Sequence, residues 1–559
     1  MSGNDKIKFF SIFIFLFLSL IPFLKILIFK NYSHFFVYDE ISFESVVFYL
    51  TKSYSLINNK SLSYVENIDS NLIFLSNDFI PNIINSIFVL IFKEYSNLFL
   101  NLFTSFISLS LIFFFLIKVF KFEYSESLLL TVILFIFLGI GPDSIITIYD
   151  YFFFNELRET LFLRYFSPSL TIFMFLTYLF FLNNINKKKN FKWLSLFSIL
   201  NIFTYFYSSL IIFALNSLLS FKYLKLKNYK SFIIINSITL IGCFFYLYLF
   251  FIYQEFLQAA EVAVPNFKID LEFILSNYRN NLVSLILLIL VLIFKSKLDN
   301  EIIRKLLLMH FVFQCLTIFD LFLNIQINLH LSMYFFRPLN WISLFYLIYK
   351  LFLFKQRNFF LVIFVIYVSF SYFLQNYKYY SNINLENQKN LKEQIKIVNN
   401  LKNIEIFLQK ENINKKEIFI NDSYTNMIFS SIISPTKNNL FIKNSGLFRS
   451  NKNTIEDRVK IFTDYCTFFD IKKDNCYYEF LANHNNKYFN NSFIFTGNRK
   501  FNRERFDDFY KKSEYNKSFL IKKSSFLIQI LSYKYHNLDS KLIEEGFNKQ
   551  VFDNLILYY

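Results

Sequence analysis

Long apolar runs fill most of this 559-residue chain up to Tyr379. Nine of them are close to the roughly 20 residues that an α-helix needs to cross the hydrocarbon core of a bilayer. A further stretch, from Trp193 to Ser220, is too long for one such helix and is polar around 205–209, so it is expected to form a helical hairpin. The pattern predicts a polytopic α-helical membrane protein with about 11 transmembrane helices. The nine runs cover residues 8–29, 98–120, 125–141, 169–184, 231–253, 280–296, 303–323, 337–354 and 358–376.

Basic residues gather in the short loops between these runs. A net charge of +17 would suggest a nucleic-acid partner in a soluble protein, but lysines in the loops between apolar helices are the signature of cytoplasmic loops. With eleven spans, every basic cluster falls on one side, which predicts a cytoplasmic N-terminus and no nucleic-acid partner. The clusters are Lys6 and Lys8, Lys118 and Lys121, Lys187–Lys189, Lys222–Lys230, Lys295–Lys305 and Lys350–Arg357.

Four longer segments fall on the opposite, extracytoplasmic side: 31–97, 142–168, 254–279 and 324–336. Within them, residues 41–56, 79–92 and 144–163 carry apolar side chains at helical spacing among polar ones. This spacing is typical of helices that lie along a membrane surface. Together they are expected to cover a cavity that opens outward.

The composition changes after Tyr379 to Asn, Lys, Glu and Gln with short apolar runs. We therefore expect a transmembrane domain over 1–379 and a soluble extracytoplasmic α/β domain over 380–559. Strands are predicted within 417–422, 439–444, 493–497 and 526–531, and helices within 386–411 and 454–470. Cys466 and Cys476 would pair in an oxidising compartment, and the alternative of buried free thiols stays open.

Acidic candidates for chemistry stand just beyond the first span. Asp39 and Glu40 follow it in the sequence FFVYDE, where a carboxylate at the membrane boundary could abstract a proton or bind a cation. The alternative is an ordinary hydrated acidic loop. Asp143, after Gly141 and Pro142, is a further candidate carboxylate or simply a turn residue.

Two candidate arginines stand at the extracytoplasmic starts of two later spans. Arg164 and Arg337 each stand just before or at a helix start that contains a proline, and the guanidinium fork suits phosphate oxygens. His330 precedes Arg337 in the same outer segment. The alternative is structural arginines paired with nearby acids or reaching for the interface. Within the run 303–323, Gln314 and Asp320 are polar.

This layout resembles the GT-C superfamily of integral-membrane glycosyltransferases, which use polyprenyl-phosphate-linked sugars. The resemblance covers the acidic pair Asp39 and Glu40 in the first outward loop, the surface helices after the first span, the number of spans and the outward C-terminal domain. It implies that Asp39 acts as the catalytic base and that Arg164 and Arg337 hold the lipid phosphate. A spaced acidic pair that binds metal in some members is not evident, so dependence on a divalent metal stays open.

The implied function is transfer of a hexosyl or pentosyl group from a polyprenyl-phosphate donor to a glycan, lipid or protein acceptor. It would take place on the extracytoplasmic face of a bacterial inner membrane, in assembly of the cell envelope. Two alternatives share the same layout. One is a flippase of lipid-linked sugars or a polymerase or ligase of the envelope, and the other is a non-catalytic membrane assembly protein.

Overall fold

The computed structural model describes most of the helical part of the chain and selected parts of the tail. The described residues are 3–28, 53, 57, 79–92, 95–137, 170–184, 188–204, 206–252, 279–294, 299–323, 335–351, 357–386, 388–412, 417–420, 438–439, 463, 466–467, 472–476, 507–508, 510–512, 527–530, 542–544, 546–553 and 555–559.

The described part of each of the nine apolar runs is almost entirely helical, and the predicted hairpin is confirmed as two helices. Its first helix ends at Ile202 and its second begins at Phe206, so the break comes just before most of the polar residues that suggested it, and Tyr207, Ser208 and Ser209 lie in the second helix. The helices up to Glu386 are α1 (Gly3–Leu20), the 3₁₀ turn η1 (Ile21–Phe23), α2 (Leu24–Ile28), α4 (Phe79–Phe92), α5 (Ser96–Val119), α6 (Tyr124–Ile136), α8 (Thr171–Asn183), α9 (Lys188–Ile202), α10 (Phe206–Lys225), α11 (Tyr229–Ile252), α14 (Arg279–Ile293), α15 (Asn300–Leu323), α17 (Arg337–Leu351) and α18 (Arg357–Glu386).

Four described stretches of helix are long and apolar enough to cross a membrane: Asp5–Ile28, Leu98–Val119, Tyr229–Leu247 and Phe360–Asn382. Shorter apolar helices occupy Ile80–Phe92, Tyr124–Ile136, Thr171–Asn183 and Asn281–Ile293. The chain is thus mostly helical and carries several helices suited to a bilayer.

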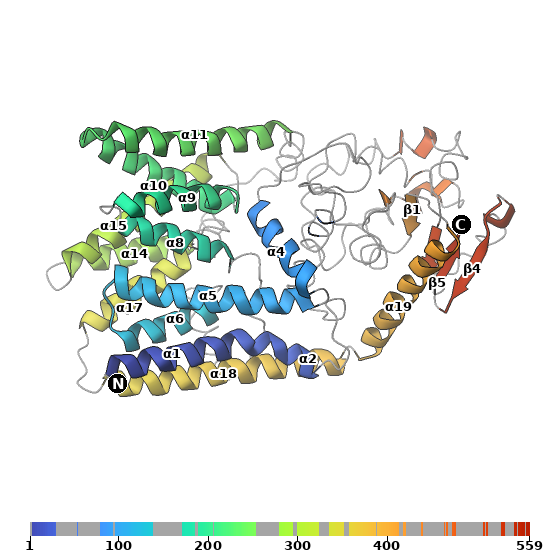
Figure 1. Ribbon diagram of the computed structural model, residues 1–559, viewed down its shortest axis with the longest axis horizontal. Coiled ribbons are helices and arrows are strands. Elements are labelled where there is room, and N and C mark those ends of the chain that lie inside the picture. The colour runs from blue at the N-terminus through green and yellow to red at the C-terminus, as the bar shows by residue number, and fades with distance from the viewer. Residues whose placement is uncertain are drawn as a thin grey trace.

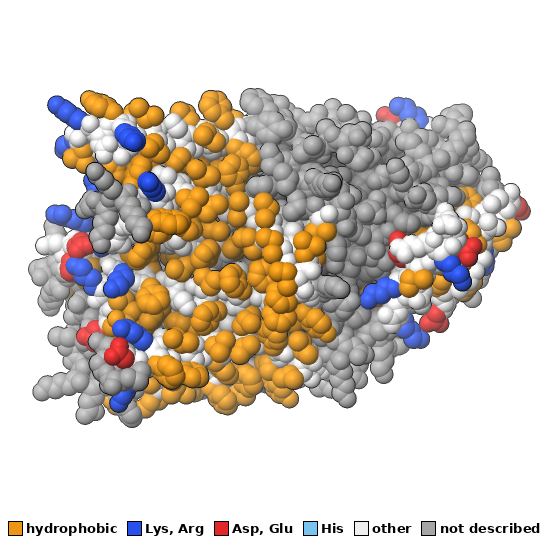
Figure 2. All heavy atoms as spheres, viewed as in Figure 1, with side chains coloured by type: hydrophobic (Ala, Val, Ile, Leu, Met, Phe, Trp, Pro, Cys, Tyr) orange, Lys and Arg blue, Asp and Glu red, His pale blue; other side chains and the backbone are white. Residues whose placement is uncertain are grey.

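The outward faces of these helices are apolar, which is the reverse of a soluble bundle. On α11, Ile233, Ile241 and Phe244 are each at least 60% exposed. Figure 2 shows hydrophobic side chains as a broad band over the helical bundle, with Lys and Arg gathered at the end of the bundle away from the sheet. A continuous apolar band of this kind favours lipid as the surrounding solvent.

Packing inside the bundle brings together helices that are distant in sequence. The first span lies beside α18, and α11 forms the opposite lateral side of the bundle (Figure 1). The Phe17 and Phe373 rings lie 5.7 Å apart. One large cluster of buried apolar side chains runs through the bundle from Ile14 to Tyr380. Pro22 interrupts the first span with a short 3₁₀ turn because proline has no N–H to donate within an α-helix. The apolar run itself predicts one unbroken helix, so this interruption is a correction.

Helix α4 crosses the far end of the bundle at an angle to the others (Figure 1), and it occupies the predicted surface helix 79–92. The Ile80 N–H donates to the carbonyl of Phe203, in the turn between α9 and α10, at 3.1 Å. Two of its asparagines are buried, and Asn85 Nδ2 donates to Ser53 Oγ at 2.8 Å. The predicted helix 144–163 lies outside the described residues.

The tail contains a small mixed sheet and a long helix, α19 (Gln388–Lys410). The strands β1 (Glu417–Ile420), β2 (Asn438–Asn439), β3 (Leu527–Ile530), β4 (Lys549–Phe552) and β5 (Leu555–Tyr558) are ordered β2-β1-β3-β5-β4. Strand β1 is parallel to β2 and β3, whereas β3 and β4 are antiparallel to β5. Every residue of β5 is buried, and Phe407 of α19 packs on Phe552 and Tyr559.

The predicted strands 417–422 and 526–531 correspond to β1 and β3, and the predicted helix 386–411 to α19. The antiparallel pair β4 and β5 was not predicted. The predicted boundary between residues 379 and 380 falls inside α18, which continues to Glu386. The predicted strand 493–497 lies outside the described residues, as does most of the predicted helix 454–470.

Candidate functional site

Of the residues predicted to carry function, the structure describes Arg337. Asp39, Glu40, Asp143, Arg164 and His330 lie outside the described residues, so their positions relative to Arg337 stay predictions. The site is therefore built from Arg337 and from the described groups that position it.

The two ends of the bundle differ in charge. At one end, Lys121 in the loop between α5 and α6 contacts Glu301 at 2.7 Å and Asp299 at 3.5 Å. Lys305 contacts Glu301 at 2.8 Å and donates to the carbonyl of Val119 at 2.9 Å. These contacts join the start of α15 to the turn between α5 and α6, and we refer to this side as the basic end.

Ionisation at the basic end follows from these contacts. Hydrogen bonds from Lys121, then from Lys305, lower the pKa of Glu301 to about 2. The Glu301 backbone N–H, more than the charge of Lys121, lowers the pKa of Asp299. The same partners raise the pKa of Lys121, first through its hydrogen bond to Glu301. Lys121, Asp299 and Glu301 are therefore charged near neutral pH.

Arg337 begins α17 on the side away from the basic end. Nine residues later, the hydroxyl of Tyr346 accepts a hydrogen bond from the Asp299 backbone N–H at 3.3 Å, which fixes the basic end of α17. At 1.5 Å per residue, Arg337 lies about 13 Å further along the helix axis. Its side chain is half-buried, and Pro338 follows it in the first turn, where proline is tolerated.

Aromatic packing holds the start of α17 in place. Phe335 and Phe336, directly before Arg337, are buried. The Phe336 ring lies 5.2 Å from Phe313 of α15, and the Phe335 ring lies 5.0 Å from Phe175 of α8. Four residues beyond Arg337, Trp341 lies 6.3 Å from Phe137 at the end of α6. Four helices thus meet where α17 begins.

A set of polar side chains, all buried except the half-buried Gln314, runs between α14, α15 and α17, and we call it the polar seam. One hydrogen bond joins Ser284 Oγ to His310 Nδ1, and another joins His310 Nε2 to Ser343 Oγ at 2.9 Å. All three side chains are fully buried. Asn281 donates to Thr317, and Gln314 donates to the carbonyl of Asn281 at 2.9 Å. The seam consists of Asn281, Ser284, His310, Gln314, Thr317 and Ser343.

Sequence reasoning selected Gln314 but missed His310. The sequence could have indicated His310, because it is the one histidine in the apolar run 303–323 and lies about one helical turn before Gln314. Its partners, Ser284 and Ser343, lie in two other apolar runs, where a serine alone indicates nothing. Asp320 belongs to α15, and its side chain lies outside the described residues.

Two further features lie in the described part of the chain. Lys25 of α2 is buried, and its Nζ lies 5.0 Å from the ring centre of Tyr380 on α18. This contact ties the far end of the first span to the helix that leads into the tail. Among the described residues, no group of three or more His, Cys, Asp or Glu side chains is placed to hold a metal ion.

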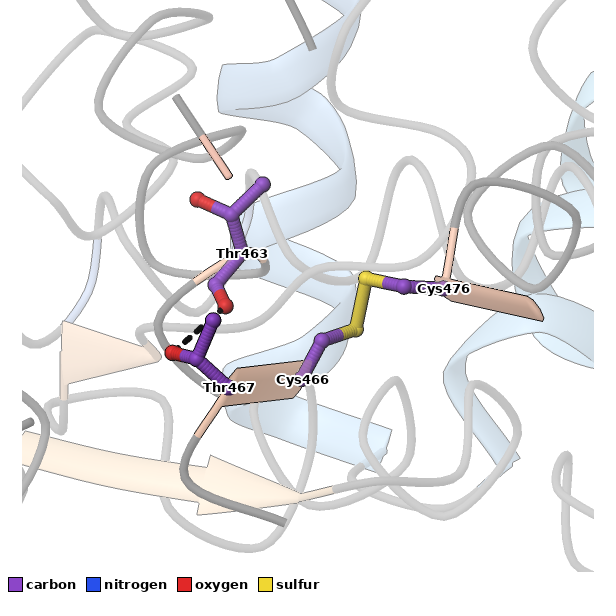
Figure 3. Close-up of a disulfide and its surroundings, with 4 residues drawn as sticks. All are labelled: Thr463, Cys466, Thr467 and Cys476. Atoms are coloured by element: carbon purple, nitrogen blue, oxygen red, sulfur yellow. Dashed lines mark hydrogen bonds between the residues drawn. A yellow bond between two sulfur atoms is a disulfide. The ribbon is translucent and has the colours of Figure 1, made fainter. Parts of the chain in front are cut away.

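Cys466 and Cys476 form a disulfide in the tail (Figure 3). Their Cα atoms are 5.9 Å apart, and both side chains are buried. Nearby, the Thr467 hydroxyl donates to the Thr463 carbonyl at 3.1 Å, as in one turn of helix. The two alternatives left open by the sequence are thereby resolved in favour of the pair.

Comparison with known proteins gives no family for this chain. No protein-family model matches the sequence, and no curated protein matches it. The functional argument therefore rests on the residues and their geometry.

Proposed function

We propose that this protein is a membrane glycosyltransferase of the GT-C type. It transfers a sugar from a polyprenyl-phosphate donor to an acceptor on the extracytoplasmic face of a bacterial inner membrane, in assembly of the cell envelope. In this proposal the chain crosses the bilayer eleven times, and residues 380–559 form an extracytoplasmic α/β domain.

The position of Arg337 carries the proposal. Lysines and arginines at the cytoplasmic side of a membrane protein need no further explanation, because they set its orientation. Arg337 begins α17 at the side away from the basic end, among buried aromatic rings. The positive-inside rule does not account for an arginine on that side, and the guanidinium fork suits the phosphate head group of an anionic lipid.

The disulfide supports the orientation. Disulfides persist in oxidising compartments and are rare in the bacterial cytosol. The pair Cys466–Cys476 therefore favours a tail outside the cytoplasm. The basic end then faces inward, in agreement with the positive-inside rule.

The proposed chemistry is a direct displacement. Asp39 takes the proton from an acceptor hydroxyl, and the oxygen attacks the anomeric carbon of the donor sugar. The bond between that carbon and the phosphate oxygen breaks, and polyprenyl phosphate leaves with the bonding electrons. Arg164 and Arg337 stabilise the charge on the leaving phosphate, and Glu40 assists Asp39. The product has the inverted anomeric configuration.

The test compares strains of the native host that express the wild type, Asp39→Asn or Arg337→Ala. Surface glycans and pools of lipid-linked sugar are measured by mass spectrometry. We expect both variants to lack the glycan and to accumulate the lipid-linked sugar. Arg304→Ala is the matched control, because Arg304 is an exposed arginine at the basic end. Glycans unchanged in both variants would refute the proposal.

A second candidate function, a flippase of lipid-linked sugars, is favoured by one observation. The polar seam brings a buried histidine into the middle of an apolar bundle, and polar groups at that depth are common in transporters. The two functions differ in where lipid-linked sugar accumulates. A defective transferase leaves it in the outer leaflet, and a defective flippase leaves it in the inner one.

A further inference from the structure

The turn between α10 and α11 carries four exposed lysines: Lys222, Lys225, Lys227 and Lys230. None of them forms an ion pair with a carboxylate in the part of the chain that the structure describes. The sequence supplies no acid nearby along the chain, because it contains no Asp or Glu between positions 160 and 254. We call residues 222–230 the lysine turn.

The rest of the basic end is different, because several of its lysines are paired with acids. Lys8, Lys121 and Lys305 each contact a carboxylate there. Figure 2 shows Lys and Arg side chains without Asp or Glu at the upper left, over α10 and α11, and acidic side chains lower on the same end. The positive-inside rule explains an excess of lysine at this end, but it does not require one group of lysines to stand apart from every carboxylate.

Backbone hydrogen bonds give the lysine turn a defined shape. The Lys227 N–H donates to the Leu224 carbonyl at 3.0 Å. The Asn228 N–H donates to the Tyr223 carbonyl at 2.9 Å, and the Asn228 side chain accepts from the Ser231 N–H at 3.3 Å. The four lysines are therefore held close together, within nine residues that end one helix and begin the next.

Lys227 is the left-handed residue of this turn, with a φ of 54°. Glycine is the residue that usually adopts this conformation. Lys121 has a φ of 55° in the turn between α5 and α6, and there its ammonium group contacts both Glu301 and Asp299. The described chain supplies no such anion to Lys227, although the two lysines occupy similar turns at the same end of the bundle.

The helix dipoles act differently on the lysines of the turn. Lys222 and Lys225 lie in the last turn of α10, where a cation is favourable. Lys230 is the second residue of α11, and a cation at the start of a helix is unfavourable because the dipole is positive there. An anion bound at the turn would offset this repulsion.

The start of α9 lies beside the lysine turn. The rings of Phe191 on α9 and Tyr223 on α10 are 5.8 Å apart. Lys192, next to Phe191, is exposed, and the Trp193 side chain is 43% exposed. A further lysine and a tryptophan therefore belong to the same surface.

Apolar side chains interleave with these lysines. Phe221, Leu226 and Tyr229 are 71%, 63% and 59% exposed. Such side chains are unfavourable in water, but at a bilayer interface they insert among the acyl chains while neighbouring lysines reach the head groups. The surface therefore suits a lipid partner better than a soluble one.

We propose that the lysine turn and the start of α9 bind the head groups of anionic phospholipids in the leaflet at the basic end. The lysine ammonium groups are point charges that bind phosphate oxygens, and the apolar side chains between them contact the acyl chains. Anionic lipids attract basic segments near the membrane surface in this way. The proposal does not rest on sugar transfer.

The experiment uses Trp193 as a reporter of the lipids around it. The chain has two tryptophans, so the full-length variant Trp341→Phe leaves fluorescence from Trp193 alone. It is reconstituted in phosphatidylcholine liposomes with a minor fraction of either brominated phosphatidylglycerol or brominated phosphatidylcholine, since bromine on the acyl chain quenches a tryptophan that it contacts. We expect quenching that corresponds to an enrichment of phosphatidylglycerol of about threefold to tenfold next to Trp193.

Charge variants on this background test whether the turn itself is responsible. Lys227→Gln with Lys230→Gln should abolish most of the enrichment, and arginine at both positions should retain it. The matched control is Lys6→Gln with Lys118→Gln, which removes the same charge from exposed lysines of α1 and α5 at the same end and should keep the enrichment.

A second pair of substitutions covers the case in which a change at the left-handed residue prevents folding, as judged by circular dichroism. Lys222→Gln with Lys225→Gln leaves Lys227 in place and should also reduce the enrichment. Equal loss in the lysine-turn variants and in the α1 and α5 control would overturn the proposal in favour of a general surface charge. Equal quenching of Trp193 by the two brominated lipids would also overturn it, and would leave an acidic soluble protein as the partner of the turn.

Discussion

Asn216 of α10 joins four helices through its side chain, and its replacement by alanine should destabilise the bundle measurably. Its Oδ1 accepts from the Tyr178 hydroxyl of α8 at 2.9 Å. Its Nδ2 donates to Ser198 of α9 at 2.9 Å and to Thr239 of α11 at 3.3 Å. Asn216 is fully buried, so water cannot replace these bonds.

Hydrogen bonds between membrane helices contribute about 0.6 kcal/mol each on average. Three of them give an expected loss of about 2 kcal/mol in the free energy of unfolding of Asn216→Ala. Tyr178→Phe, which removes one of them, should lose about 0.6 kcal/mol. The double variant should lose no more than Asn216→Ala, because the tyrosine then has no partner left to lose.

The assay is reversible unfolding in detergent micelles, followed by circular dichroism as denaturing detergent is added. Ser217→Ala is the matched control, since the neighbouring Ser217 donates only to the Phe213 carbonyl of its own helix at 2.8 Å. Its free energy of unfolding should stay within about 0.5 kcal/mol of the wild type. Equal losses in Asn216→Ala and Ser217→Ala would refute the reasoning.

The disulfide, the basic end and one close helix contact each give a further prediction. Replacement of Cys466 and Cys476 by serine should cost the tail about 2–4 kcal/mol of stability, measured by urea unfolding; unchanged stability would contradict the disulfide. Because folding lowers the pKa of Glu301 to about 2, its contribution to stability is present above its ordinary pKa and is lost as pH falls through about 2. The Tm of Glu301→Gln should therefore fall less than that of the wild type as the pH is lowered from the ordinary glutamate pKa to about 2, and parallel curves would contradict this ion pair. Gly242→Ala should destabilise the bundle by about 1–3 kcal/mol, because a Cβ would lie 2.7 Å from the Phe213 ring; Cys243→Ala next to it is the control, and equal unfolding free energies would contradict the close approach.

The helices up to Glu386 could be predicted because their apolar runs are long and their breaks are polar. The turn between α9 and α10 is the clearest case, since the polar residues around 205–209 placed the break within a few residues of where it occurs. The turn at Pro22 had a sequence signal that the prediction overlooked, since a proline inside a helical run commonly breaks or kinks the helix.

The strands β4 and β5 were missed for a different reason. They are four residues each, and Asp553, which has a positive φ of 46°, lies in the short turn between them. Such short runs at a chain end carry little periodicity. Their role is visible only in the sheet, where β5 lies between β3 and β4 and buries all four of its side chains.

The polar seam was only partly predictable. Gln314 stands out as polar in an apolar run, and His310 has the same property, but neither shows which helices it will meet. Ser284 and Ser343 lie 26 and 33 positions from His310. Serine is common in membrane helices because it bonds its own backbone, so neither serine stands out. Which helices pack against each other depends on contacts between distant segments, and the residues around His310 or Gln314 in the sequence do not show those contacts.

The most direct test of the central claim is sugar transfer by the purified protein in liposomes that contain lipid-linked sugars extracted from the host membrane, with a host envelope extract as acceptor. Polyprenyl phosphate released over time is measured by mass spectrometry. We predict release by the wild type and by Arg304→Gln, and release at the level of protein-free liposomes by Asp39→Asn. Release by Asp39→Asn at the wild-type rate, or none by the wild type, would contradict a transferase that uses Asp39 as its base.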